Sequence, residues 1–260
     1  MRFYQVDAFT DAVFGGNPAG VCILGDTWIS DDLMQKIAME NNLSETAFVV
    51  QENDVYAIRW FTPTVEVPLC GHATLAAAHV LFNHEGYEED EIIFTNGDKT
   101  LKVRNSSGLL TLDFPVDKIW QIEFSDMLDC FNFRPAEVWR GTEEYMLVFE
   151  NQKQIEDIVC NMDKASKIDL SGIIATAKAN DDGLSFVSRY FAPKIGIPED
   201  PVTGSTHTLL VPYWSEKLGE DSHVAQQSSA RGGVLFLQND NDRVLIGGRA
   251  VTYLAGEIFV

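Results

Sequence analysis

Short apolar runs alternate with polar segments through the first half of the chain and predict β-strands. The runs are rich in β-branched and aromatic residues and are bounded by turn-forming residues, as strands usually are. They lie at residues 2–9, 21–24, 45–50, 55–61, 91–96, 100–104 and 109–114. The segment 10–20, TDAVFGGNPAG, interrupts them and is expected to be an irregular loop.

Two segments of the first half predict helices. In 29–42, Ser30 suits the N-cap position, and Asp31 and Asp32 suit the positive end of the helix dipole. The second segment, LCGHATLAAAHVLF at 69–82, is an almost unbroken run of small apolar residues. A helix that is apolar on nearly all sides is expected to be buried.

The second half repeats this plan. Apolar runs that predict strands lie at 145–150, 172–179, 184–191, 223–228, 233–237, 243–248 and 255–260. Segment 151–162 is helical in character, and 205–218 predicts a second buried helix. Pro212 lies inside that helix and is expected to kink it or to end its regular part.

The two halves also share a motif. The stretch RWFTPTVEVPLCGHATL begins at Arg59, and RYFAPKIGIPEDPVTGSTHTL begins half a chain length later at Arg189. Such an internal repeat indicates two related domains. We predict a first domain at 1–114 and a second at 115–251, with the closing strand, at about 252–260, a candidate to cross back to the first.

In each copy of the motif a glycine, Gly71 or Gly204, stands at the start of the buried helix. The free N–H groups of a helix start carry partial positive charge and suit a carboxylate. We expect the two helix starts to face one another across a cleft between the domains. Polar residues crowd both starts: Cys70, His72, Thr74, Asp200, Thr203, Ser205 and His207. Glu45, in NNLSETAF, adds a carboxylate.

Charge and composition exclude several classes of protein. The chain has 39 acidic and 19 basic residues, a formal net charge of −20 and no Lys/Arg cluster, which disfavours nucleic acid and anionic membranes as partners. No apolar run is long enough to span a bilayer, and the first residues read as a strand, so a cytoplasmic location is expected. The four cysteines form no CxxC and are predicted to be free thiols.

The sequence offers no recognisable cofactor or metal motif. GGNPAG at 15–20 is not GxGxxG, and no GxxxxGK[ST] occurs, so neither NAD nor ATP is predicted. No two of the five histidines have a spacing typical of zinc, and His79 and His207 are expected to be structural. We therefore predict that the protein uses no cofactor and no metal.

Four motifs together resemble the PhzF-like family of phenazine-biosynthesis isomerases and their relatives. These are NPAGV, LSETAF, FTPTVEVPLCGHATLAAAHVL and EDPVTGSTH, in this order along essentially the whole chain. The resemblance implies the diaminopimelate epimerase-like fold, a mixed α/β fold of two pseudo-symmetric domains. Each domain is a mostly antiparallel sheet curled around a central buried helix, with the active site between the domains. It also implies a homodimer.

The resemblance maps the catalytic residues of the family onto Glu45, His72 and Asp200, and substrate binding onto Ser205. Epimerases of this fold use two cysteines as acid and base, but the second helix start here contains no cysteine. A single carboxylate that carries a proton between two carbons fits this departure. Glu45 is then the proton carrier on a small carboxylic acid, with Gly71, Gly204 and Thr74 as further substrate-binding residues.

Two other functions stay open at this point. Cys70 and His72 can be read as the nucleophile and base of a hydrolase, although the sequence assigns no acid to orient the histidine. The protein can also be read as a small-carboxylate binding or regulatory protein without turnover. The identity of the substrate is not readable from the sequence, because pocket shape determines it.

Overall fold

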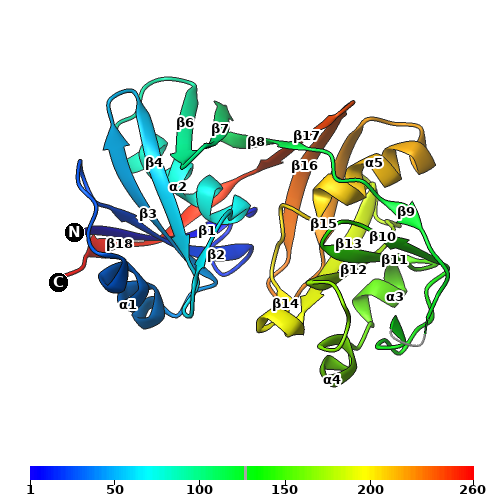
Figure 1. The fold of residues 1–260 in the computed structure, drawn as a ribbon. Helices are drawn as coiled ribbons and strands as arrows, with labels where there is room; N and C mark the ends of the chain where they lie inside the picture. Colours follow the sequence, from blue (N-terminus) through cyan, green and yellow to red (C-terminus); the bar gives the residue numbers. More distant parts are fainter. Residues whose placement is uncertain (126–127) are drawn as a thin grey trace. The chain divides into compact units, whose positions relative to one another are not determined.

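The computed structural model describes residues 1–125 and 128–260, which fold as two compact units (Figure 1). Unit 1 comprises residues 1–113 and 247–260, and unit 2 comprises residues 114–246. No helix among the described residues is both long and apolar enough to cross a membrane.

The sheet of unit 1 is mixed and mostly antiparallel. Its strands are β1 (Arg2–Ala8), β2 (Asn17–Ile23), β3 (Glu45–Glu52), β4 (Val55–Phe61), β5 (Glu66–Val67), β6 (Glu91–Asn96), β7 (Lys99–Ser106), β8 (Leu109–Pro115, whose last two residues belong to unit 2) and β18 (Ala250–Glu257). They pair in the order β18-β1-β2-β3-β4-β6-β7-β8, with β5 on the end of β4. Only β2–β3 and β4–β6 are parallel among these pairs.

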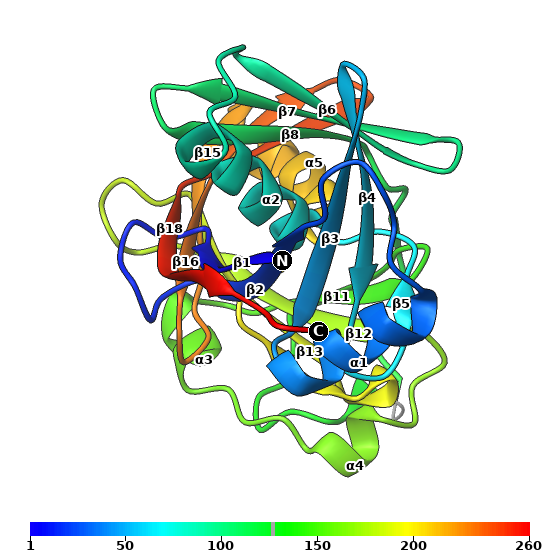
Figure 2. The ribbon, with the colours of Figure 1, turned by 90° about the vertical axis from the view of Figure 1, so that its left-hand side faces the viewer.

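Helix α2 (Gly71–His84) is the buried centre of unit 1. It packs on β1, β2, β3 and β18, and the curled sheet partly surrounds it in Figure 2. Nearly every residue from His72 to Leu81 is buried, which explains the almost unbroken apolar run in the sequence. Helix α1 (Asp31–Asn41) begins at the N-cap Ser30, as predicted, and packs on β3 and β4.

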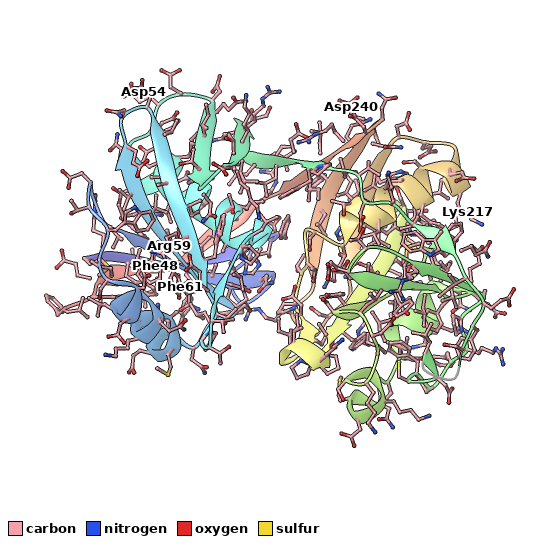
Figure 3. The ribbon with its side chains drawn as sticks, in the orientation of Figure 1. Phe48, Asp54, Arg59, Phe61, Lys217 and Asp240 are labelled. Carbon is pink, nitrogen blue, oxygen red and sulfur yellow. The ribbon has the colours of Figure 1, made fainter. Side chains whose placement is uncertain are left out.

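An aromatic cluster joins α1 to the sheet of unit 1. Phe48 and Phe61 meet edge to face with ring centroids 5.5 Å apart, and the Arg59 guanidinium lies 5.2 Å from the Phe61 ring centroid (Figure 3). Arg59 also pairs with Asp31 on α1 at 2.8 Å. The cluster therefore anchors the start of α1 against β4 by apolar contact and by charge.

Unit 2 repeats the strand order of unit 1. Its strands are β9 (Trp120–Gln121), β10 (Glu137–Arg140), β11 (Glu144–Val148), β12 (Gly172–Lys178), β13 (Phe186–Ala192), β14 (Ile197–Asp200), β15 (Ser222–Gln227), β16 (Gly233–Asp240) and β17 (Arg243–Gly248, whose last two residues belong to unit 1). The order β9-β10-β11-β12-β13-β15-β16 matches β18-β1-β2-β3-β4-β6-β7, and the parallel pairs fall at the same places. The repeat found in the sequence is therefore a repeat of topology.

Helix α5 (His207–Leu218) corresponds to α2 and continues through Pro212. A proline cannot donate a hydrogen bond to the carbonyl four residues earlier, which here is Thr208. The Thr208 oxygen instead accepts a hydrogen bond from the Asp117 backbone N–H at 3.3 Å. An outside donor thus satisfies the carbonyl that the proline leaves without a helical partner.

The predicted fold class, a mixed α/β fold with mostly antiparallel curled sheets around buried helices, is confirmed. Two local predictions are wrong. Strand β2 begins at Asn17, inside the segment predicted as a loop, because residues 17–23 pair in full with β1. The closing strand, predicted at 255–260, is β18 at Ala250–Glu257.

A third local prediction is also wrong, because residues 151–162 do not form one helix. They hold α3 (Gln152–Glu156) and the start of α4 (Met162–Ala165). The Ile155 and Ile158 carbonyls accept hydrogen bonds from Arg189 Nη1 at 3.3 and 3.1 Å. The backbone of Cys160 forms an isolated antiparallel β-bridge with that of Phe131. These tertiary partners replace the bonds that would have continued the helix.

Candidate active site

Glu45 and His72 lie together in unit 1. Glu45 is the first residue of β3 and lies opposite Ala19 of β2, while His72 is in the first turn of α2, which packs on β2. Glu45 Oε2 is 3.2 Å from His72 Nε2. Both side chains are buried, with 12% and 7% of their surface exposed. A carboxylate and an imidazole are thus held in contact away from bulk water.

The imidazole of His72 is neutral at physiological pH. Burial lowers the pKa of His72 to about 3, because the charged form would lose its hydration. A neutral imidazole carries a hydrogen on only one of its two nitrogens. The neighbours of each nitrogen therefore decide what the ring offers to Glu45.

Two side chains approach the other ring nitrogen, Nδ1. The Cys70 Sγ atom and the Asn17 Nδ2 atom each lie 3.4 Å from it. Ser44 Oγ donates a hydrogen bond to Asn17 Oδ1 at 3.1 Å. Asn17 and Cys70 are both buried, so the ring is enclosed on this side too.

Glu45, Cys70 and His72 offer three potential metal-ligand atoms that all lie within 4.8 Å of one another. However, the thiol meets Nδ1 of the ring, whereas the carboxylate meets Nε2. One imidazole gives a metal ion only one of its nitrogens. The arrangement therefore suits a chain of hydrogen-bonding groups better than a shared ion.

Two more predicted site residues lie at the same helix start. Gly71 is the first residue of α2, directly after the N-cap Cys70. Thr74 is fully buried, and its hydroxyl donates to the Cys70 carbonyl at 2.6 Å. The hydrogen bond of the Thr74 hydroxyl is therefore made within the first turn of α2 in this structure.

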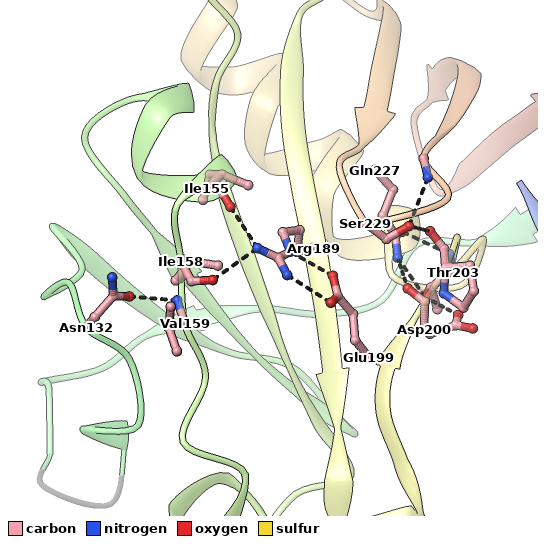
Figure 4. A network of polar contacts seen from close by, with 12 residues as sticks. Asn132, Ile155, Ile158, Val159, Arg189, Glu199, Asp200, Thr203, Gln227 and Ser229 are labelled. Carbon is pink, nitrogen blue, oxygen red and sulfur yellow. Dashed lines mark hydrogen bonds and ion pairs between the residues drawn. The ribbon is translucent and has the colours of Figure 1, made fainter. Parts of the chain in front are cut away.

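The remaining predicted site residues lie in unit 2. Asp200 ends β14 and is buried, and Thr203 Oγ1 donates a hydrogen bond to its Oδ2 atom. Gln227 Nε2 donates to the Asp200 carbonyl at 2.9 Å, and Gln227 Oε1 accepts from the Thr203 backbone N–H at 2.9 Å (Figure 4). These bonds fix the turn that carries the Asp200 carboxylate.

Gly204 and Ser205 follow in the turn that leads into α5. Ser205 is exposed, and its carbonyl accepts a hydrogen bond from Thr208 Oγ1 at 2.7 Å. His207, the first residue of α5, is fully buried, and its Nδ1 atom lies 2.9 Å from the Thr203 carbonyl. Its Nε2 atom is buried and has no hydrogen-bond partner among the described residues, so the expected structural role of His207 stays a prediction.

Sequence reasoning assigned no role to three residues that shape these groups, which are Asn17, Ser44 and Gln227. Asn17 and Ser44 stand in NPAGV and LSETAF, two of the motifs that carry the family resemblance. That context could have drawn attention to both. Gln227 lies in an ordinary strand, where nothing in the surrounding sequence distinguishes it.

Comparison with known proteins gives consistent matches. The model of the phenazine biosynthesis-like protein family, PhzC-PhzF, matches residues 6–256. A protein of Pseudomonas aeruginosa named an uncharacterized isomerase is 44% identical over 99% of this chain and 98% of its own length. The crystal structure of a PhzF family protein from Enterococcus faecalis is 41% identical, with a TM-score of 0.96, and covers 100% of this chain and 99% of its own.

A more distant structure shares the fold alone. A hydroxyproline epimerase from Agrobacterium vitis has a TM-score of 0.61 at 11% sequence identity and covers 98% of this chain and 91% of its own. The repeated sheet and helix arrangement is therefore also found in an epimerase.

Proposed function

Since the chain belongs to the phenazine biosynthesis-like PhzC-PhzF family, we propose that it is a cofactor-independent isomerase in which Glu45 moves a proton on a small carboxylic acid. The observation that carries the proposal is the buried contact of 3.2 Å between Glu45 Oε2 and His72 Nε2. The names of relatives at 44% and 41% identity, both called isomerases, support the reaction class.

The proposed proton shift requires one group that carries the proton and further groups that bind the substrate. A carboxylate can take a proton from one carbon and return it to another when it is close to both. The neutral His72 ring beside it cannot act as a strong acid, so we assign His72 the role of orienting Glu45. The N–H groups at the start of α2, including that of Gly71, are proposed to bind the substrate carboxylate.

Asp200 and Ser205 are included in the proposal on the family resemblance alone. Asp200 is proposed to position the substrate or relay charge, and Ser205 to bind the carboxylate together with Gly204. Substrate binding by Thr74 stays a prediction from the sequence, since its buried hydroxyl donates to the Cys70 carbonyl. The Asp200 side chain is held by Thr203, which suits a group that must keep one orientation. The homodimer and the cytoplasmic location likewise stay predictions from the sequence.

The hydrolase reading of Cys70 and His72 is less well supported. Glu45 does supply the acid that the sequence left unassigned, since it contacts the ring nitrogen opposite Cys70. However, the pKa of His72 is lowered to about 3 by burial, so the ring is a poor base for taking the proton of a thiol. A thiolate and an imidazolium would both have to form in a buried site, which is costly.

Hydrogen exchange in deuterated water tests the proposal. A panel of small chiral and unsaturated carboxylic acids is incubated with the protein, and deuterium on carbon is measured by mass spectrometry. We expect uptake on at least one acid with the wild type and with Glu40→Gln, a control at an exposed helix position, and at least a hundredfold loss with Glu45→Gln.

Three outcomes would count against parts of the proposal. Full exchange by Glu45→Gln would refute Glu45 as the proton carrier. Calorimetric binding of an acid without exchange by the wild type would favour a carboxylate-binding protein. Loss of exchange after dialysis against a chelator, restored by adding a metal, would refute cofactor independence.

A further inference from the structure

Asn17 is a buried polar residue to which the proposed reaction gives no task. It begins β2, pairs with Ala8 of β1 and is fully buried. Its side chain reaches two residues of the candidate site. Ser44 Oγ donates to its Oδ1 atom at 3.1 Å, and its Nδ2 atom lies 3.4 Å from His72 Nδ1. Burying an amide is costly unless its hydrogen bonds are made, so this placement calls for a physical reason.

The amide nitrogen of an asparagine can only donate hydrogen bonds. In the structure, Asn17 Oδ1 accepts the hydrogen bond of Ser44 and the NH2 group faces His72 Nδ1. The contact of Nδ2 with Nδ1 then requires that Nδ1 accepts and carries no hydrogen. The Cys70 thiol, also 3.4 Å from Nδ1, is a second donor to the same lone pair.

The other face of the ring leads to the same assignment. A neutral imidazole without a hydrogen on Nδ1 carries it on Nε2. Nε2 faces Glu45 Oε2 at 3.2 Å and has no hydrogen-bond partner of good geometry among the described residues. Although the N–H is not aligned for a hydrogen bond, its partial positive charge at this distance attracts the carboxylate, whereas the lone pair of an unprotonated Nε2 would repel it.

We propose that Asn17 is a positioning residue that holds His72 in the tautomer with its hydrogen on Nε2, so that the neutral ring has this N–H, and not a lone pair, beside Glu45. The contacts run from Ser44 to Asn17, from Asn17 to His72 and from His72 to Glu45. The catalytic role of this series of contacts rests on the proposed function of Glu45. The tautomer of His72 does not depend on that function, because it follows from the hydrogen-bond donors and acceptors around the ring.

Nitrogen NMR of protein labelled with 15N-histidine tests the tautomer directly. Long-range correlations from ring protons distinguish a protonated from an unprotonated nitrogen, and His72→Gln identifies the signals of His72. In the wild type at about pH 7 we expect Nε2 to be protonated and Nδ1 unprotonated. A hydrogen on Nδ1 in the wild type would overturn the proposal, and this measurement needs no variant of Asn17.

Asn17→Asp is the matching substitution, because it keeps the shape of the side chain but replaces the donor by an acceptor. We expect Nδ1 of His72 to become protonated and proton exchange to fall by about tenfold to a hundredfold. Asn83→Asp is the control, since Asn83 Nδ2 lies 3.3 Å from Nδ1 of a different histidine, His79. It should leave the His72 signals and the exchange rate unchanged.

The results separate this inference from the proposed function. An unchanged His72 spectrum in Asn17→Asp, or full exchange despite a changed tautomer, would overturn the positioning role. Absence of exchange with every acid in the wild type would refute the proposed reaction but would leave the tautomer result standing. Circular dichroism confirms whether Asn17→Asp is folded, and the wild-type spectrum decides the tautomer if it is not.

Discussion

Arg189 and Glu199 form an ion pair with two hydrogen bonds, Nε to Oε1 at 2.7 Å and Nη2 to Oε2 at 2.8 Å. The pair joins β13 to β14, the strand that ends at Asp200 (Figure 4). Its counterpart in unit 1 is the pair of Arg59 with Glu66, with both bonds at 2.7 Å. The two units thus repeat a bidentate ion pair as well as a sheet order.

The two pairs differ in burial and therefore in their expected contribution to stability. The side chains of Arg189 and Glu199 are 15% and 22% exposed, whereas those of Arg59 and Glu66 are 23% and 39% exposed. Glu199→Gln should lower the free energy of unfolding by about 1 to 3 kcal/mol, because it leaves a partly buried guanidinium without its charge partner. Urea unfolding monitored by circular dichroism measures this loss.

Glu66→Gln is the matched comparison in unit 1. Arg59 keeps its contact with Asp31 at 2.8 Å in that variant, so we expect a loss below about 1 kcal/mol. Equal losses for the two substitutions, or a larger loss for Glu66→Gln, would contradict the role assigned to burial.

Glu144, at the start of β11, should make the stability of the protein depend on pH. Burial, together with the nearby Asp117 and Glu143, raises the pKa of its carboxyl to about 7, and a hydrogen bond with Tyr190 opposes part of this rise. A carboxyl with a raised pKa in the folded state favours folding while it is protonated. That stability is fully present below the unfolded value of about 4.5 and is lost as the pH rises through about 7.

Glu144→Gln cannot ionise and should remove this dependence. At about pH 8 we expect the variant to be more stable than the wild type by about 1 to 2 kcal/mol, a value reduced for the partial exposure of the side chain. Urea unfolding from about pH 5 to about pH 8 measures the slope. Glu150→Gln, at an exposed position just after β11, is the control and should keep the wild-type slope. A wild-type slope in Glu144→Gln would refute the prediction.

At Gly172, the first residue of β12, the Tyr190 side chain occupies the space that a side chain would need. A Cβ atom at this position would lie 2.5 Å from the Tyr190 hydroxyl oxygen and 2.6 Å from its Cε2 and Cζ atoms. Because Tyr190 is buried, the ring cannot move aside without loss of packing. Gly172→Ala should therefore lower the free energy of unfolding by about 1 to 3 kcal/mol.

Gly256→Ala serves as the control for this substitution. It lies in the exposed part of β18, and its added Cβ would be 3.9 Å from the nearest atom, Leu254 Cδ2. We expect a change within about 0.5 kcal/mol, measured by the same unfolding assay. A neutral effect of Gly172→Ala would mean that β12 and β13 can separate at this point without cost.

Sequence reasoning predicted the elements whose pattern is strong and continuous. The apolar run that became α2 and the β-branched runs of β3 and β4 carry their structure in their own residues. It failed where partners far along the chain decide the outcome. Segment 151–162 has helical character, but Arg189 takes two of its carbonyls. Strand β10, only Glu137–Arg140, was not predicted because four residues carry too little pattern.

The site shows the same division. Glu45 and His72 were predicted from the family resemblance, but their contact depends on how α2 packs against β2 and on the pairing of β2 with β3. The spacing of residues along the sequence gives no information on this packing or on this strand pairing. Asn17 was missed because its segment reads as a loop, whereas strand pairing buries it beside His72.

The return of β18 to β1 has a consequence for the order of events during synthesis. The backbones of Met1 and Ile258 exchange hydrogen bonds of 3.1 and 2.9 Å, and unit 1 is built from two stretches of the chain, one before and one after unit 2 in the sequence. Unit 2 is continuous, and all its residues have left the ribosome before β18 has. The edge of β1 that pairs with β18 therefore stays unpaired until β18 has been synthesised, and it can form non-native strand pairs during that time.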